Sequence, residues 1–258
     1  MYKKRSFKKK IKSILQSSRK LLPTYMVKPF IIIHIFNILQ AVCGNGHFVF
    51  YSVEILSGVR RNQSAQFLDV YFCNFFLSIV RLIFIFATCI IIFHVGRRPV
   101  ALISGLGSSA SILTGALLLY LRSPSAQSVM DDWIIFGSIV LFIGFYTFGF
   151  SCLPTLMIGE MQTAELRSFM TGYIFTVNDL TSGAILLRYY SMVDQLGIQG
   201  LFLMFALACL VCTVFVYFFL PETHGKSLLE MEVYFQQHNV LWKRRKNYRN
   251  KHLIISEQ

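Results

Sequence analysis

Six long apolar runs constrain the fold of this chain more than any other feature. They cover residues 29–57, 67–93, 99–121, 133–157, 169–190 and 199–220. About 20 consecutive apolar residues are enough for an α-helix to cross the hydrocarbon core of a bilayer. Charged residues make up only 14% of the chain, against about 25% in typical soluble domains. The sequence therefore predicts an all-α integral membrane protein with six transmembrane helices.

The basic residues predict how these spans are oriented. Ten of the 25 Lys and Arg residues precede the first span and seven follow the last. An even number of spans places both ends on one side, where the connecting loops add Arg97, Arg98 and Arg167. The opposite loops carry three, namely Arg60, Arg61 and Arg122. Because Lys and Arg are enriched on the cytosolic side, we expect a multi-pass plasma-membrane protein with both termini in the cytosol.

The segments outside the spans are assigned by their charge. Residues 1–28 form a basic arm that is too long before its first apolar run to be a signal peptide. We expect this cytosolic arm to be attracted to anionic lipid headgroups, and we expect no nucleic-acid partner, because topology alone requires such basic flanks. Residues 221–258 form a cytosolic tail, and Asn62 begins an Asn-Gln-Ser glycosylation sequon in the first non-cytosolic loop.

We find no set of residues with the spacing that catalysis or metal binding needs. His34 and His47 lie in the first span, where a lone His at membrane depth is more often a packed or hydrogen-bonded side chain than a metal ligand. We therefore expect a protein that is not an enzyme, with no catalytic residue, no metal and no cofactor. Gly107, Ser111 and Gly115 recur every four residues on one face of the third span, which predicts close helix packing there.

Three cytosolic motifs carry a family resemblance. Residues 221–232 resemble the P-E-T-K-G-K-S-L-E-E-I-E signature of sugar porters in the major facilitator superfamily. Residues 96–98 are similar to the end of the family's D-R-x-G-R-R loop, and Glu160 with Arg167 matches its E-x6-R loop. The resemblance covers essentially the whole chain as the C-terminal half of a twelve-helix fold, and it makes residues 1–28 similar to the linker between the halves.

In this family the cytosolic loops form a charge network that holds the helix ends together. The resemblance thus implies gate and scaffold roles for Gly96, Arg97, Arg98, Glu160, Arg167, Pro221 and Glu222. Phe93 stands where the family usually has an acidic residue. One ion pair of the network is therefore expected to be missing.

The sugar-binding pattern is less well preserved. Residues 40–46 resemble the family's Q-Q-x-S-G-x-N, with Gln40 retained, and Tyr51 fits the aromatic residue that follows. Ala41 and Gly46 replace polar residues of the motif. Asn45 is one position early, which rotates it by about 100° around a continuous helix.

Four further cavity candidates follow from the resemblance. Thr155 stands at the position of an aromatic residue in the family, and Asn178 is retained from the motif S-N-W. Arg81 and Asp179 occupy positions that the family keeps neutral. A charge at membrane depth is costly, so the two either form an ion pair across the cavity or face water separately.

The resemblance implies facilitated diffusion of a hexose or of a disaccharide such as trehalose, as in insect members of the family. The implied partners are a sugar, the lipid bilayer, and an N-terminal six-helix half or a second copy, because one half supplies only one wall of the path. Three alternatives remain. The chain is the C-terminal part of a full transporter, as a short form or an incomplete gene model; a non-transporting half that binds or regulates full-length relatives; or half of a homodimeric transporter.

Overall fold

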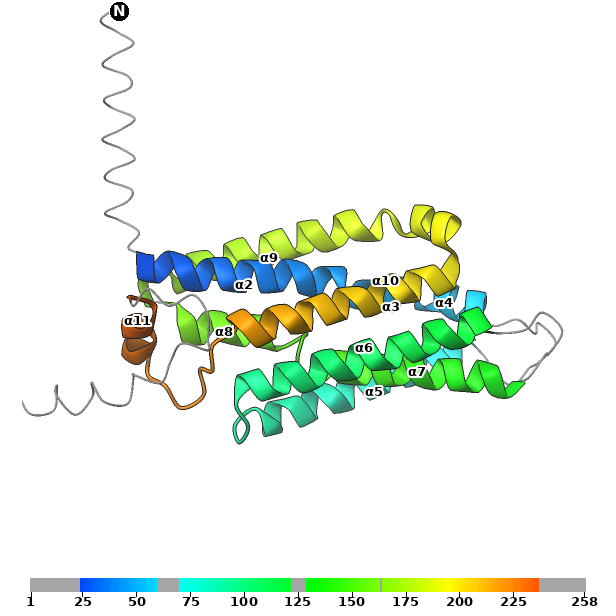
Figure 1. Cartoon of the computed structure of the whole chain (residues 1–258), viewed down its shortest axis with the longest axis horizontal. Helices are drawn as coiled ribbons and strands as arrows, with labels where there is room; N and C mark the ends of the chain where they lie inside the picture. Colours follow the sequence, from blue (N-terminus) through cyan, green and yellow to red (C-terminus); the bar gives the residue numbers. More distant parts are fainter. Residues whose placement is uncertain (1–23, 60–69, 122–128, 163, 237–258) are drawn as a thin grey trace, which may run out of the picture.

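The described residues are 24–59, 70–121, 129–162 and 164–236 of a computed structural model, and they form ten helices and no strand. In chain order these are α2 (Thr24–Val42), α3 (Asn45–Phe50), α4 (Ser52–Val59), α5 (Val70–Ile91), α6 (Arg97–Leu121), α7 (Val129–Phe148), α8 (Leu153–Met161), α9 (Ala164–Leu186), α10 (Tyr189–Phe219) and α11 (Leu228–Gln236). The long helices run side by side along the bundle, and α11 lies at the end where α2 begins (Figure 1). We call this the terminal end.

The helices pack in a fixed order across the bundle. Helix α6 lies between α7 and α10, α5 packs on α7, and α2 contacts α9, α10 and α11. The core is richest in fully buried side chains of α7 and α10, among them Ile135, Ile139, Phe142, Tyr146, Leu201, Phe202 and Phe205. Helix α5 instead exposes most of its large apolar side chains. Its outer face is therefore open to lipid or to another helix.

The first apolar run is not one continuous helix. Gly44 has a left-handed backbone (φ 92°, ψ −1°) and separates α2 from α3. A Cβ atom at this position would lie 2.5 Å from the ring of Phe205 in α10, so the break needs glycine for both its conformation and its space. The expectation of a single helix over 29–57 is therefore wrong, and three shorter helices replace it.

A second break divides the fourth apolar run between α7 and α8. Pro154 follows at the start of α8, where its missing amide proton does no harm. The Ser104 hydroxyl donates to Phe145 O (2.7 Å) and accepts from Phe150 N (3.0 Å), while the Thr88 hydroxyl donates to Phe148 O (3.0 Å). Hydroxyls of α5 and α6 thus satisfy backbone groups that a break at membrane depth would leave unpaired.

The length and composition of the helices identify four candidate membrane spans among the described residues. They are Val70–Ile91, Arg97–Leu121, Met130–Met161 and Tyr189–Phe219. The first run is interrupted at Gly44, and α9 carries polar residues such as Asn178 and Asp179. Helix α9 also ends at Leu186, earlier than the expected 190, and α10 begins before the expected 199 with a kink at Gly197. The count of six spans stays a prediction.

Several expectations fall outside the described residues. These are the sequon at Asn62, nearly all of the basic arm, and the part of the tail after residue 236.

The close approach expected from the small residues of the third span is confirmed. A Cβ atom on Gly107 would lie 2.5 Å from the Phe145 ring of α7, and one on Gly115 would lie 2.5 Å from Ser138 Oγ. Ser111 is buried on the same face of α6. The contact between α6 and α7 therefore depends on the absence of side chains at the two glycines.

This packing predicts the effect of a single methyl group. Gly107→Ala should destabilise the protein by about 1–3 kcal/mol, because the Phe145 ring must move to accept it. Gly137→Ala is the matched control, since nothing lies within 4 Å of a Cβ atom there and alanine favours a helix. Unfolding in detergent, followed through the reactivity of the buried thiols of Cys43, Cys209 and Cys212, measures both. Equal loss in the two variants would contradict the packing described.

Candidate functional site

The terminal end gathers the predicted scaffold residues into a cluster of polar contacts. It comprises Arg97 at the start of α6, Glu160 in α8, and Glu222, Thr223 and His224 after α10; we call these five residues the terminal cluster. Because α6, α8 and α10 are far apart in the sequence, the contacts between these side chains fix where three helix ends lie relative to one another.

Arg97 and Glu160 form the ion pair of the cluster. Arg97 donates from Nη2 to Glu160 Oε1 at 2.7 Å and from Nε to both carboxylate oxygens at 3.1 and 3.3 Å. The side chains are 12% and 25% exposed, respectively, so the pair is only partly screened by solvent. The Thr223 hydroxyl also donates to Glu160 Oε2. Glu160 therefore joins the start of α6 to the segment that follows α10.

Glu222 caps α6 from a distant part of the chain. Its Oε1 accepts from the backbone amide of Arg97 at 2.9 Å, and its Oε2 accepts from that of Arg98 at 3.2 Å. The first amides of a helix have no partner within the helix, and the N-terminus carries partial positive charge. A carboxylate there accepts hydrogen bonds from these amides and is attracted by the partial positive charge. Caps of this kind contribute about 1–2 kcal/mol to the stability of the folded protein.

Gly96 leaves room for this cap. A Cβ atom at Gly96 would lie 2.5 Å from Glu222 Oε2 and 2.8 Å from the carboxyl carbon. The carboxylate is held by the amides of Arg97, Arg98 and His224, so it cannot move aside without losing hydrogen bonds. Gly96 is therefore required, because a side chain there would displace the Glu222 carboxylate from the amides of Arg97 and Arg98.

The other predicted scaffold residues differ in their contacts. Arg98 Nη2 donates to the backbone oxygen of Tyr217, and the guanidinium carbon lies 5.4 Å from the centre of that ring. Pro221 is buried directly after α10, and Phe93 is 74% exposed. Within the part of the chain that the structure describes, no hydrogen bond or ion pair links Arg167 to the terminal cluster, and its Nε is buried without a hydrogen-bond partner. The predicted match of Glu160 and Arg167 thus places only Glu160 in the network.

A second polar group lies around the break at Gly44. The Tyr146 hydroxyl of α7 donates to Gln40 O at 3.0 Å, and Arg81 Nη2 of α5 donates to Asn45 Oδ1 at 3.4 Å. Both acceptors flank the break between α2 and α3. Because the helix is interrupted, Asn45 does not follow the rotation of a continuous helix, and it faces the guanidinium of Arg81.

An ion pair between Arg81 and Asp179 is not present. Asp179 is exposed on α9, and its Oδ1 accepts from the Asn178 amide at 3.5 Å. Thr155 is exposed on α8. Of the two alternatives for the charged residues at membrane depth, the structure therefore has the one in which they lie apart.

Tyr51 belongs to a cluster of aromatic rings at the end opposite the terminal end. Its ring stacks on Tyr189 with 4.2 Å between centroids and 8° between planes, and Tyr190 meets it edge-on at 5.7 Å. The Tyr51 hydroxyl donates to Leu186 O at 3.3 Å. The six cavity candidates thus lie on several helices, and the hydrogen bonds and ring contacts of the described residues do not join them into one group.

Four residues in these contacts were not predicted from the sequence: Thr223, His224, Asn45 and Tyr146. Thr223 and His224 lie within the motif 221–232, beside the predicted Glu222. Asn45 lies between Gly44 and Gly46, a pair that signals a helix break. Tyr146 had no such signal, since only the approach of α7 to the end of α2 in the folded chain brings its hydroxyl to Gln40.

Comparison with known proteins places these contacts in context. The family model described as "Sugar (and other) transporter" matches residues 2–235. The facilitated trehalose transporter Tret1 of Culex quinquefasciatus is 25% identical over 206 residues, which are 80% of this chain and 39% of that protein. The chain therefore spans about two fifths of the length of this curated relative.

Solved structures share the fold. A crystal structure of a double-tryptophan mutant of XylE matches with a TM-score of 0.71 and 16% identity, covering 88% of this chain and 47% of that one. The proton:xylose symporter XylE bound to 6-bromo-6-deoxy-D-glucose matches with a TM-score of 0.65 and 16% identity, covering 80% of this chain and 42% of that one. This likeness shows that the chain shares the fold of the corresponding part of these structures.

The geometry of the cap predicts a specific coupling between two substitutions. Glu222→Gln should destabilise the protein by about 1–2 kcal/mol, because the amides at the start of α6 lose a charged acceptor. Gly96→Ala should cost a similar amount by displacing the same carboxylate. The double variant should then be little worse than either single variant, which unfolding midpoints in detergent measure.

The control for this cycle is Glu54→Gln, which changes an exposed carboxylate of α4 in the same way. It should leave the midpoint nearly unchanged. Additive losses from Gly96→Ala and Glu222→Gln would show that the two residues act independently, contrary to the contact described.

Proposed function

The chain belongs to the sugar transporter family, and we propose that it forms the C-terminal six-helix half of a transporter that moves a hexose or trehalose across the plasma membrane by facilitated diffusion. The observation that carries the proposal is the terminal cluster. Arg97, Glu160 and Glu222 stand at positions of the family's cytosolic motifs, and Arg97 binds Glu160 through its side chain and Glu222 through its backbone amide. Such contacts keep one half rigid while it rocks against the other.

The interrupted helices support a path for a polar substrate. Gln40 and Asn45 flank the break at Gly44, and Arg81 of α5 donates to Asn45, so polar groups meet there among otherwise apolar helices. In transporters of this type, discontinuous helices near the middle of the membrane bind the substrate. Facilitated diffusion then requires only that the protein interconverts between two states open to opposite sides, without covalent chemistry or a cofactor.

Two unpaired polar side chains support a requirement for a second half. Both amide atoms of Gln162 and the Nε atom of Arg167 are buried and have no hydrogen-bond partner among the described residues. Buried polar groups usually find partners, because leaving one unpaired costs about 1–3 kcal/mol. Gln162 directly follows α8 and Arg167 lies in the first turn of α9, so a rearrangement of this region when a neighbouring six-helix half docks is proposed to give them partners.

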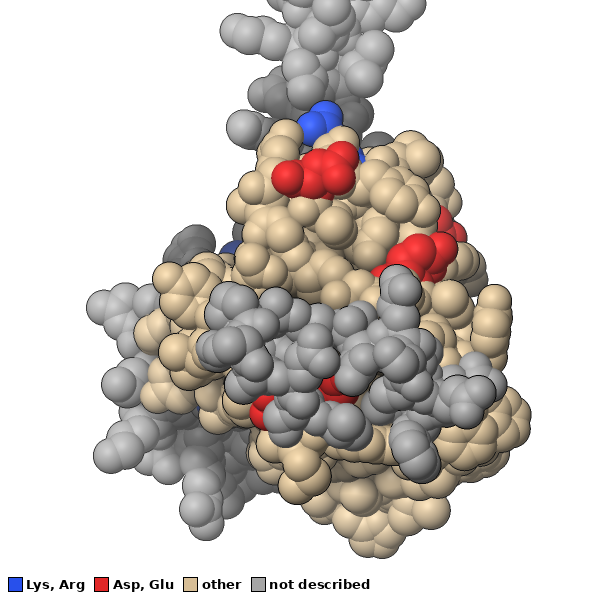
Figure 2. Space-filling model, turned by 90° about the vertical axis from the view of Figure 1, so that its right-hand side faces the viewer, with Lys and Arg blue, Asp and Glu red and all other residues tan. Residues whose placement is uncertain are grey.

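The distribution of charge supports an orientation with cytosolic termini. Lys28, Arg97, Arg98 and Arg167 lie near the terminal end. Figure 2 shows the opposite end, where the described surface is mostly uncharged and has several acidic and few basic side chains. An excess of basic residues on the cytosolic side is typical of membrane proteins.

Sugar uptake tests the proposal directly. Cells that lack their own sugar transporters should take up labelled trehalose or glucose when this chain is expressed with the N-terminal six-helix half of a close relative. The chain with Glu222→Gln should reach the membrane less well or transport less, whereas Glu54→Gln should behave as the unmodified chain does. Surface labelling of each variant separates loss of expression from loss of transport.

The same experiment has a clear negative outcome. If properly inserted chain gives no uptake of either sugar with the supplied half, the transport proposal is contradicted. Uptake by the chain alone would contradict the need for an N-terminal half, and crosslinking would then distinguish a dimer from a monomer.

A further inference from the structure

Arg81 is a charged side chain near the middle of the apolar helix α5. Leu77 and Thr88 lie four residues before it and seven after it, so they share its face of the helix. Both are buried, whereas Leu82 and Ile83, which directly follow Arg81, are 55% and 58% exposed. Arg81 therefore lies on the face of α5 that is turned into the bundle and not on its open face.

The charge of Arg81 is not neutralised in the part of the chain that the structure describes. No carboxylate there lies within ion-pair distance of its guanidinium, and its Nε atom is buried without a hydrogen-bond partner. Its Nη2 atom donates to Asn45 Oδ1 at 3.4 Å, which is a long bond to a neutral acceptor. A charge at membrane depth usually faces a cavity or a partner. An anion that reaches Arg81 would supply the opposite charge that the described residues lack.

Asn45 adds hydrogen-bond donors beside the guanidinium. Because its Oδ1 atom accepts from Arg81, its amide nitrogen keeps two donors for another group. On the other side of the break at Gly44, the backbone oxygen of Gln40 already accepts from the Tyr146 hydroxyl. The groups of Arg81 and Asn45 that remain available are therefore donors, which bind the oxygens of an anion and not a cation.

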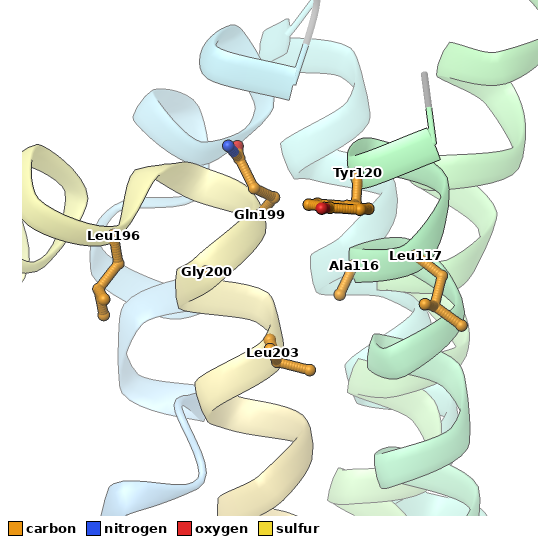
Figure 3. A pocket seen from close by; sticks show the side chains of 7 residues that line it. All are labelled: Ala116, Leu117, Tyr120, Leu196, Gln199, Gly200 and Leu203. Atoms are coloured by element: carbon orange, nitrogen blue, oxygen red, sulfur yellow. The ribbon is translucent and has the colours of Figure 1, made fainter. Parts of the chain in front are cut away.

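A groove elsewhere in the molecule lacks such a charge. It lies between α6 and α10, has a volume of about 430 Å³, and contains Tyr120 and Gln199 as its polar side chains (Figure 3). Both are uncharged, and Leu117 and Leu203 on its walls are about half exposed. This groove can accept a hydrocarbon chain, but an anion would find no charged partner among its lining residues.

We propose that Arg81 and Asn45 bind the carboxylate of an anionic sugar, a hexuronate, and that the path therefore prefers it to a neutral hexose. A guanidinium can donate two parallel hydrogen bonds to a carboxylate, and the Asn45 amide can donate a third. One carboxylate matches one guanidinium, whereas a phosphate group carries nearly two charges. The sugar part of this ligand rests on the proposed function, and the carboxylate rests on the contacts of Arg81.

Competition between glucuronate and glucuronamide tests the site. The two sugars are nearly equal in size and differ in charge. The chain is expressed with the supplied N-terminal half, and uptake of labelled glucose is measured with each competitor outside the cells. Glucuronate should inhibit uptake at an at least about tenfold lower concentration, because charge-assisted hydrogen bonds are roughly twice as strong as neutral ones.

Two variants remove the anion site in different ways. Arg81→Gln deletes the charge and should abolish the difference between the two competitors. Asn45→Asp supplies a carboxylate within the protein, which should pair with Arg81 and exclude that of the ligand. Because this pair compensates a partly buried charge, Asn45→Asp should fold at least as well as the unmodified chain. The test therefore does not depend on the stability of Arg81→Gln. Inhibition by glucuronamide should change little in either variant.

Two further variants are matched controls. Arg188→Gln removes the same charge from an exposed position at the start of α10. Gln199→Ala removes the exposed amide of the groove between α6 and α10. Both should keep the full preference for glucuronate.

Three outcomes would overturn the anion site. Equal inhibition by the two competitors in the unmodified chain would show that the charge of Arg81 is not available to the ligand, for example because the other half pairs with it. A preference that survives in Arg81→Gln and Asn45→Asp would place the recognition elsewhere. Equal loss in Arg81→Gln and Arg188→Gln would show a general attraction of anions to the protein.

The results also separate this proposal from the proposed function. Uptake of glucose with equal inhibition would leave the proposed function in place and overturn the anion site. If neither glucose nor trehalose is taken up, thermal unfolding of the purified full chain decides. Glucuronate should then raise the midpoint more than glucuronamide does, and Asn45→Asp should remove this difference. Equal or absent shifts would overturn the anion site.

Discussion

The Glu222 carboxylate and the first amides of α6 make the contact on which the arrangement of the terminal end depends. The residues it joins are separated by 125 positions in the chain, so the contact exists only when α10 returns to the start of α6. Once it forms, Thr223 is placed beside Glu160, and Glu160 in turn binds Arg97. A single carboxylate thus orders a helix terminus and the ion pair next to it.

In the interior of the bundle, too, a few polar side chains supply hydrogen bonds that the backbone needs. A helix that is broken at membrane depth leaves amides and carbonyls without partners, and lipid cannot supply them. Here the hydroxyls of Ser104 and Thr88 donate to backbone oxygens at the break after α7, and the Tyr146 hydroxyl donates to a backbone oxygen at the break after α2. These contacts allow the chain to interrupt two helices and to expose polar groups near Gly44. The proposed sugar path would run past these polar groups, which a bundle of continuous apolar helices would not offer.

The sequence predicted the parts of the fold that depend on local pattern. Apolar runs predicted membrane helices, small residues at four-residue spacing predicted the contact of α6 with α7, and the family motifs singled out Arg97, Glu160 and Glu222. It was wrong about the continuity of the first run, because one left-handed glycine outweighs a long hydrophobic pattern. The hydrogen bond from Arg81 to Asn45 could not be predicted, because it depends on how distant helices approach. For the same reason, nothing in the sequence indicated that Arg167 Nε is buried without a partner among the described residues. Asn45 was placed from the sequence by its rotation around a continuous helix. The helix is in fact broken at Gly44, so that rotation does not apply.

Hydrogen exchange at the start of α6 tests most directly whether Glu222 organises the terminal end. The amides of Arg97 and Arg98 should be protected in the unmodified chain, although the first amides of a helix normally exchange readily. In Glu222→Gln they should exchange about tenfold faster, as the loss of a cap worth about 1–2 kcal/mol implies. Amides in the core of α7 should not change. Rapid exchange at Arg97 and Arg98 in the unmodified chain, or equal rates in the two proteins, would contradict this account.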